Sequence, residues 1–187
     1  MSYSEPARIA ARRTRSAILA ALVVVVSTTT LSHPRALGET DGAVSEGVRV
    51  FDDHIPAVAH LDPSLLRALR QAAMDAAKDR IEIVVNSGWR SREYQKQLLH
   101  DAVAKYGSEK KAARWVATAN TSPHVWGYAV DLGPSRATAW LSRHGAEYGL
   151  CQIYRNERWH YELRPEAIDD GCPSMYADPR HDPRMHQ

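Results

Sequence analysis

The feature that most constrains this chain is a pair of potential metal ligands, His124 and Asp131, on either side of Gly127. The alternation of residues 127–132 predicts a strand that carries the aspartate, so the histidine would lie in the turn before it. Imidazole nitrogen and carboxylate oxygen both bind zinc, and the glycine would let the chain turn or pack closely between them. A lone histidine is more often a surface or core residue, and Asp131 alone could serve a turn or a salt bridge.

A second cluster, in residues 156–162, contains Glu157, His160 and Glu162. On a strand over residues 159–163, His160 and Glu162 would share one face, whereas Glu157 has the wrong parity. Glu157 is therefore expected in the preceding turn or at a bulge, where it could lean over a metal held by His160. Three protein ligands with an open position, beside a carboxylate, are typical of metal-assisted hydrolysis. Glu162 is interpreted as an ordinary surface residue, with a backup ligand or a group that contacts a ligand as the alternative.

Hydrophobic periodicity and capping residues predict a mixture of helices and strands. The predicted helices cover residues 63–78, 91–106, about 110–117, and 135 to 145 or 149. The predicted strands cover residues 81–85, 127–132 and 159–163. With the strands late and close together, this order predicts an α+β fold, in which helices pack on a small, mostly antiparallel sheet.

The amino-terminal region has the composition of an export signal. Arginines between positions 8 and 15 precede an uncharged apolar run over residues 17–26, which is short for a membrane span of about 20 residues. Cleavage is expected within Ala36–Gly38 or Thr30–Ser32, and an uncleaved membrane anchor is the alternative. The protein is therefore expected outside the cytoplasm, in the cell envelope or secreted. We divide the chain into a signal or anchor (1–38), a linker (39–50), a folded domain (51–175) and a loose tail without apolar periodicity (176–187).

Composition and cysteine content add further expectations. Charged residues make up 25% of the 187-residue chain, and the formal net charge of the whole chain is +2. Without the N-terminal arginines the rest of the chain is close to neutral, so composition gives no case for nucleic-acid binding. Cys151 and Cys172 form an even count, which predicts a disulfide in an exported protein. Two free buried thiols are the alternative. A monomer is expected.

Taken together, these clusters resemble the VanY-type D-alanyl-D-alanine carboxypeptidases, zinc peptidases that act on bacterial cell-wall peptides. The family pattern Ser-x-His-x-x-Gly-x-Ala-x-Asp is matched at every fixed position of residues 122–131, and Glu-x-x-His is matched by Glu157 and His160. A third family segment, Ser-Gly-aromatic-Arg-Ser, is matched at residues 87–91. The resemblance covers roughly residues 60–165.

The resemblance implies one zinc ion per chain, held by His124, Asp131 and His160, with Glu157 as the general base. It also implies that Arg90 binds substrate and helps to stabilise the developing oxyanion, which suits a fixed guanidinium in a dry site. A salt bridge at a strand end is the alternative role for Arg90. Further candidate substrate-binding residues are Gln95, Ser122 and Trp126, with Trp159 as a second aromatic wall; turn capping and core packing are the alternatives.

The fold implied by the resemblance is the small α+β zinc-peptidase fold shared with the hedgehog signalling domain. The implied partner is the peptidoglycan stem peptide, from which a D-alanyl-D-alanine carboxypeptidase releases the terminal D-alanine. An endopeptidase that cuts within the stem or cross-bridge would use the same metal site. A non-catalytic module that holds zinc is a third possibility, although it would have little reason to keep Glu157. The predicted disulfide would enclose and brace the segment with Glu157 and His160.

Overall fold

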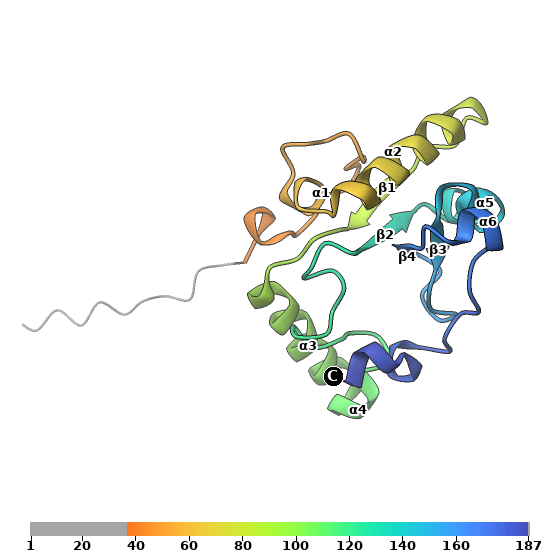
Figure 1. The fold of residues 1–187 in the computed structure, drawn as a ribbon. Helices are drawn as coiled ribbons and strands as arrows, with labels where there is room; N and C mark the ends of the chain where they lie inside the picture. Colours follow the sequence, from red (N-terminus) through yellow and green to blue (C-terminus); the bar gives the residue numbers. More distant parts are fainter. Residues whose placement is uncertain (1–36, 187) are drawn as a thin grey trace, which may run out of the picture. The chain divides into compact units, whose positions relative to one another are not determined.

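The computed structural model describes residues 37–186, so the predicted export signal falls almost entirely outside the described residues. In the described part, one antiparallel sheet has the strand order β1-β2-β4-β3, with helices packed around it (Figure 1). Its strands are β1 (Val84–Ser87), β2 (Ala129–Gly133), β3 (Leu150–Gln152) and β4 (His160–Leu163). The predicted α+β class with an antiparallel sheet is confirmed.

Two helices follow the capping chemistry of the sequence closely. Helix α2 begins after Asp62, whose carboxylate accepts hydrogen bonds from two backbone amides of the first turn. Helix α3 begins after Ser91 and ends at Gly107, which adopts a left-handed conformation. The α-helices are α1 (Pro56–Ala59), α2 (Pro63–Lys78), α3 (Arg92–Tyr106), α4 (Glu109–Ala112), α5 (Ser135–His144) and α6 (Ala167–Asp170). The 3-10 helices are η1 (Glu39–Asp41), η2 (Gly145–Tyr148), η3 (Pro179–His181) and η4 (Pro183–His186).

The hydrophobic core lies between the sheet and helices α2 and α5. Leu65 and Leu69 of α2 and Trp140 of α5 pack in the same cluster as Val130 of β2 and Tyr161 of β4. Successive residues of a strand point to opposite faces, so the neighbours of Val130 and Tyr161 along their strands point away from this core. The sheet thus separates an apolar face from a face on which polar side chains can meet.

The observed local structure differs from the predicted one in several places. Strand β1 lies a few residues later than residues 81–85, and the short strand β3 was not predicted because three residues carry no alternation. The predicted linker is packed, since Val48 and Val50 are buried and the backbone amide of Val85 donates to the carbonyl of Val48. The predicted loose tail is also wrong for residues 176–186, where Asp178 and Asp182 are buried. Ion pairs hold this segment in place, whereas the prediction had looked for apolar periodicity.

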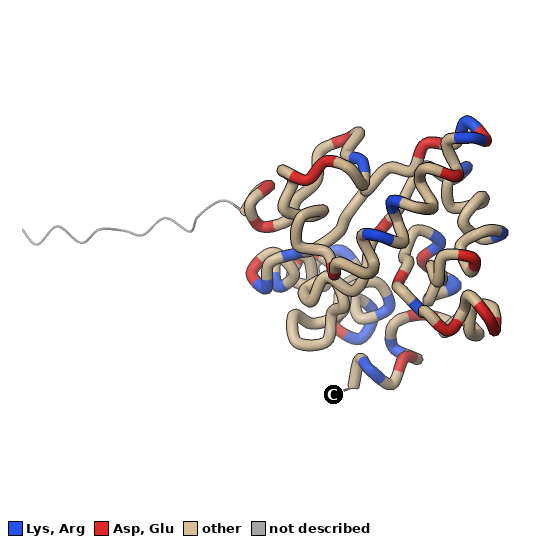
Figure 2. The backbone as a smooth tube through the Cα atoms, turned by 45° about the horizontal axis from the view of Figure 1, so that its top comes forward, with Lys and Arg blue, Asp and Glu red and all other residues tan. Residues whose placement is uncertain are grey.

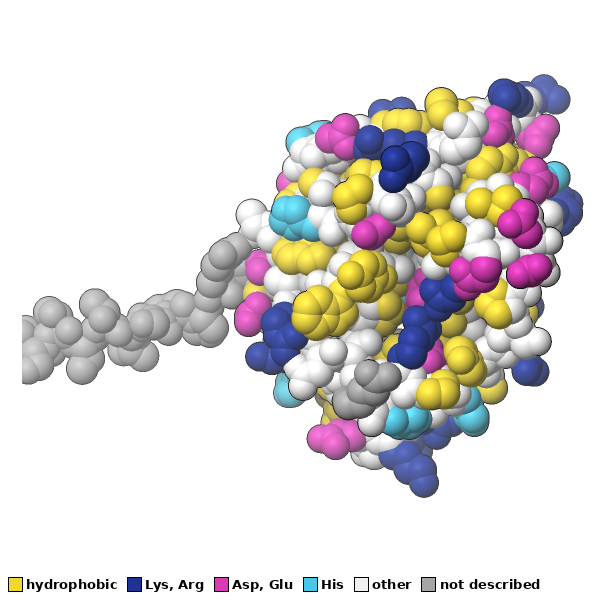
Figure 3. Space-filling model, in the orientation of Figure 1, with side chains coloured by type: hydrophobic (Ala, Val, Ile, Leu, Met, Phe, Trp, Pro, Cys, Tyr) yellow, Lys and Arg dark blue, Asp and Glu magenta, His cyan; other side chains and the backbone are white. Residues whose placement is uncertain are grey.

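Charge and apolar surface are dispersed over the described residues. Acidic and basic residues are interspersed along the backbone (Figure 2), and apolar side chains lie between charged ones on the face shown in Figure 3. Between residues 37 and 186, no helix combines the length and apolar character needed to cross a membrane.

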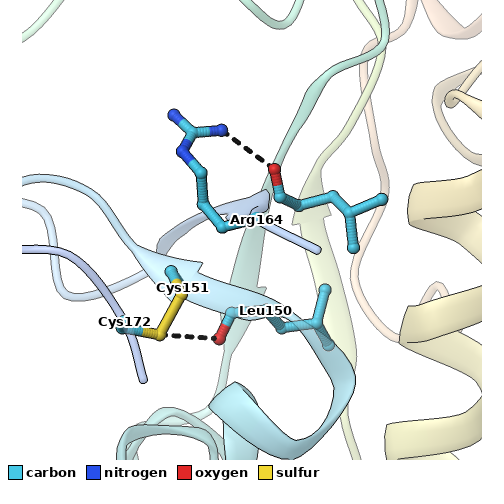
Figure 4. Close-up of a disulfide and its surroundings, with 5 residues drawn as sticks. Leu150, Cys151, Arg164 and Cys172 are labelled. Atoms are coloured by element: carbon cyan, nitrogen blue, oxygen red, sulfur yellow. Dashed lines mark hydrogen bonds between the residues drawn. A yellow bond between two sulfur atoms is a disulfide. The ribbon is translucent and has the colours of Figure 1, made fainter. Parts of the chain in front are cut away.

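The predicted disulfide is present and joins Cys151 of β3 to Cys172, which follows α6 (Figure 4). Cys172 lies beside the start of β3, with its sulfur 3.7 Å from the carbonyl oxygen of Leu150. Cys151 is paired with Glu162 in the sheet. The disulfide therefore fixes the beginning of the C-terminal region next to β4.

Candidate metal centre and active site

Three buried side chains from different parts of the chain converge on one point. His124 lies in the turn before β2, Asp131 lies on β2, and His160 begins β4 directly opposite Asp131 in the sheet. The Nε2 atom of His124 is 3.2 Å from Nδ1 of His160, and Oδ1 of Asp131 is 3.4 Å and 3.3 Å from these nitrogens. The geometry is therefore that of a potential metal centre made of two nitrogens and one oxygen.

In each histidine, the ring nitrogen that points away from this centre, called the outer nitrogen below, already has a hydrogen-bond partner. Nδ1 of His124 is 2.8 Å from the carbonyl oxygen of Gly88, and Nε2 of His160 is 3.3 Å from Oε1 of Glu162. Since carbonyl and carboxylate oxygens only accept, each outer nitrogen carries the proton and each inner nitrogen presents a lone pair. The earlier interpretation of Glu162 as a surface residue is wrong, because this side chain is buried and contacts a ligand.

The inner atoms have the electrostatics of a cation site. Oδ1 of Asp131 is buried without a hydrogen-bond partner. Burial alone would raise the pKa of Asp131, but His124, His160 and Arg90 hold it well below its ordinary value. Burial and the nearby Arg90 lower the pKa of His124. Burial would also lower the pKa of His160, yet the neighbouring carboxylates of Asp131 and Glu162 raise it to about 9. A proton or a metal ion is needed between these atoms, and the donor set fits zinc.

Glu157 lies in the turn before β4, as its parity predicted. Its Oε2 atom is 3.8 Å from Nδ1 of His160, and its Oε1 atom is buried without a hydrogen-bond partner. Burial raises the pKa of this carboxyl to about 7, against the lowering effect of His160. The side chain therefore stands beside the convergent ligands with an oxygen free to receive a proton.

Arg90 follows β1 and links the site to its surroundings. Its Nη2 atom donates to Oδ2 of Asp131 at 2.7 Å, and its Nε atom donates to the hydroxyl of Ser87 at 2.8 Å. Its Nη1 atom donates to Oε1 of Gln95 at 3.1 Å, and Gln95 itself donates to the carbonyl of Ala117 at 2.8 Å. Gln95 thus fixes the guanidinium of Arg90, which lines a small cavity together with the candidate metal ligands.

A small cavity of about 60 Å³ joins these residues. Ser122 and Trp159 line it together with the candidate metal ligands and Glu157. Trp126 is 57% exposed and does not line this cavity, so the structure does not bring it to the other site residues. The lining residues that the sequence did not suggest are Trp115, Val116, Ala117, Pro123, Tyr154, Pro179 and Met185. They are ordinary wall residues, without a spacing that would have singled them out.

Residues 58–166, more than half of the chain, match the family model VanY, described as D-alanyl-D-alanine carboxypeptidase. The chain belongs to the VanY family. Among its curated relatives is a D-alanyl-D-alanine carboxypeptidase of Enterococcus faecalis (strain ATCC 700802 / V583), 29% identical over 117 residues. That match covers 49% of this chain and 44% of the relative, so this VanY-family chain aligns with less than half of the relative's length.

Solved structures show the same fold. A mutant of the vancomycin resistance D,D-pentapeptidase VanY in complex with Zn(II) is 26% identical, with a TM-score of 0.52, over 55% of this chain and 72% of that one. VanYB in complex with D-alanine-D-alanine is 24% identical, with a TM-score of 0.55, over 59% and 74% of the two chains. The LD-carboxypeptidase LdcB is 22% identical, with a TM-score of 0.55, over 72% and 73%. The α+β zinc-peptidase fold implied by the sequence is thereby confirmed.

Proposed function

We propose that this VanY-family protein is a zinc-dependent carboxypeptidase that removes the terminal D-alanine from peptidoglycan stem peptides. One observation carries the proposal: lone pairs of His124, Asp131 and His160 converge in a cavity beside the unpartnered carboxyl oxygen of Glu157. Similar proteins support it, since one is described in complex with Zn(II) and another with D-alanine-D-alanine.

Each residue has a distinct part in this reaction. His124, Asp131 and His160 would hold one zinc ion, which when bound polarises the scissile carbonyl and lowers the pKa of water. Glu157 takes the proton of the attacking water and passes it to the leaving amine. Burial raises the pKa of Glu157 above that of an exposed carboxyl, which makes it a stronger proton acceptor. Arg90, fixed by Ser87 and Gln95, places a guanidinium where it can bind a carboxylate or a developing oxyanion.

The proposed substrate also indicates where in the cell the reaction takes place. Peptidoglycan stem peptides lie outside the cytoplasmic membrane, which agrees with the export signal predicted in residues 1–38. We therefore propose that the protein acts in the cell envelope or is secreted. Cleavage of the signal, its retention as an anchor and the monomeric state stay predictions.

The decisive experiment is mass spectrometry of a muramyl pentapeptide incubated with the full chain and zinc. Loss of one alanine, absent with the Glu157→Gln variant, is the expected result. A cut within the stem or within a cross-linked dimer would identify an endopeptidase instead. Zinc binding without any cut would support a non-catalytic module.

Two variants separate catalysis from metal binding. Glu157→Gln keeps the size of the side chain but cannot accept the proton, so kcat should fall by about 10²–10⁴-fold while zinc content stays at the wild-type level. His160→Ala removes a ligand, so both zinc and turnover should be lost. Metal analysis by mass spectrometry and steady-state kinetics measure the two effects. Wild-type activity in Glu157→Gln would rule out its role as general base.

A further inference from the structure

The C-terminal segment, defined as residues 176–186, lies beyond the part of the chain that matches the VanY family model. It returns from α6 to the neighbourhood of α4 (Figure 1), where Pro179 and Met185 line the same cavity as the metal-ligand cluster. Backbone hydrogen bonds anchor its beginning, since Tyr176 donates to the carbonyl of Ile153 at 3.0 Å. The segment is therefore a wall of the candidate active site.

Arg184 of this segment reaches the carboxylate that orients a metal ligand. Its Nη2 atom donates to Oε1 of Glu162 at 3.1 Å, and its Nη1 atom donates to Oε2 at 2.7 Å. Oε1 is the oxygen that lies 3.3 Å from Nε2 of His160. Arg164 also donates to Glu162, but only to Oε2, at 2.7 Å. Among the described residues, Arg184 is thus the arginine whose guanidinium donates to both oxygens of Glu162.

The position of Arg184 is itself fixed by buried groups. Asp182, which is fully buried, accepts from Nε of Arg184 at 3.0 Å with both carboxylate oxygens. The hydroxyl of Tyr154 donates to Asp182 at 2.9 Å, and the ring centroids of Tyr154 and His160 are 4.9 Å apart. Two routes therefore connect the C-terminal segment to His160, one through Glu162 and one through Tyr154.

We propose that Arg184 is a positioning residue for the metal site, acting on His160 through Glu162. A buried carboxylate keeps a fixed orientation only when its charge and both its oxygens are compensated. Arg184 compensates both oxygens, whereas Arg164 adds a donor to Oε2 alone, so Glu162 can hold the proton of His160 on Nε2 and leave Nδ1 as the ligand atom. The inference rests on the proposed metal site of this protein, but not on its peptidase activity.

The test is the zinc dissociation constant of the full chain, measured without substrate by competition with a chromophoric chelator. Arg184→Met should weaken zinc binding by about 10–100-fold, the usual effect of removing a group that orients a ligand. Arg164→Met should have a smaller effect, because Arg164 does not contact the oxygen that faces His160. Arg180→Met is the matched control: Arg180 lies in the same segment but pairs with Asp178, and zinc affinity should stay within about twofold of wild type.

A second measurement tests the proposed cause, which is the position of the ring proton of His160. Nitrogen NMR of the zinc-loaded protein should show the proton of His160 on Nε2 in the wild type, with a weakened Nε2–H hydrogen bond in Arg184→Met. Should Arg184→Met fail to fold, Arg184→Lys, which keeps the charge but loses the fork, is expected to lower zinc affinity to an intermediate degree.

The outcomes separate this inference from the proposed function. Equal zinc affinity in Arg184→Met and wild type, or equal losses in Arg184→Met and Arg180→Met, would overturn the role of Arg184 and leave the peptidase proposal intact. Zinc binding that depends on Arg184 in a protein without peptidase activity would support the inference and defeat the proposed function. A wild-type protein that binds no zinc would contradict both.

Discussion

Gly127 shows how a residue without a side chain lets the turn between two candidate metal ligands pack closely. It lies between His124 and Asp131 with a φ of +74°, a conformation that L side chains rarely adopt. A Cβ built at this position would lie 2.4 Å from the backbone carbonyl oxygen of His60. The carbonyl of Gly127 also accepts from the amide of Asp62 at 2.9 Å. The turn is thus pressed against the start of α2, and the close packing expected of this glycine is confirmed.

The first prediction separates backbone conformation from close packing. Gly47 has a similar φ of +82°, but a Cβ there would meet nothing within 4 Å. Gly47→Ala should therefore cost only the left-handed conformation, about 1–2 kcal/mol. Gly127→Ala should cost clearly more and weaken zinc binding, because the carbonyl of His60 or the turn with His124 must move. Denaturant unfolding with and without zinc measures both, and equal losses of stability in the two variants would refute the role of close packing.

The candidate metal ligands and Glu157 could be predicted because each belongs to a short pattern that local geometry can test. Strand parity put Glu157 in a turn, and the structure has it there. Parity also put Glu162 on the face of His160, but it could not show that Glu162 is buried. The buried carboxylate pairs with Arg184, which lies far along the chain in a segment without a hydrophobic pattern.

At the scale of elements, prediction succeeded where a helix carries its own signals and failed where an element depends on its partners. Helix α2 has a cap, a proline at its first turn and an apolar stripe, and its predicted bounds are those of the structure. Strand β3 has three residues and exists because β4 lies beside it. The C-terminal segment forms only the short 3-10 helices η3 and η4, and ion pairs of Asp178 with Arg114 and of Arg184 with Glu162 join it to the rest of the fold.

The disulfide allows a prediction at this scale. Cys151 and Cys172 close a loop that contains Glu157 and His160, so the bond should stabilise the fold by about 3 kcal/mol in the chain-entropy model. Replacing both cysteines by serine should lower the free energy of unfolding by about that amount and weaken zinc binding. Denaturant unfolding and chelator competition are the measurements. Reductant should reproduce the loss in the wild type and leave the double variant unchanged; a wild type that is insensitive to complete reduction would contradict the prediction.

At the scale of the molecule, the α+β class and the antiparallel sheet could be predicted, because the periodic segments carry most of the core. The paths of the chain before β1 and after α6 could not be predicted. Val48 and Val50 enter the core from a Gly-rich region, and the C-terminal segment is held by polar groups. Three buried carboxylates, those of Glu162, Asp178 and Asp182, pair with arginines of this part of the molecule. Closure of the domain around its site therefore depends on charge as well as on hydrophobic burial.

This dependence predicts a loss of stability in acid. Burial alone would raise the pKa of Asp178, but hydrogen bonds from Arg180 and His181 lower it to about 2. Arg114, which follows α4, also pairs with Asp178 at 3.2 Å, so this carboxylate joins two parts of the fold. Its pKa in the folded protein lies below the unfolded value of about 3.9. The stability it contributes is therefore fully present above about pH 4 and is lost as the pH falls through about 2.

Asp178→Asn, which keeps the shape of the side chain but removes its charge, provides the comparison. At pH 6 this variant should unfold at a lower temperature than the wild type, because Arg114 and Arg180 lose their partner. Between pH 4 and pH 2 the wild type should lose this advantage, and the two melting temperatures should approach each other. Asp101→Asn serves as a control, since this carboxylate is exposed and its contacts with Gln97 and His100 lie within α3. A difference between wild type and Asp178→Asn that stays constant down to pH 2 would show that shape at this position, and not charge, holds the C-terminal segment in place.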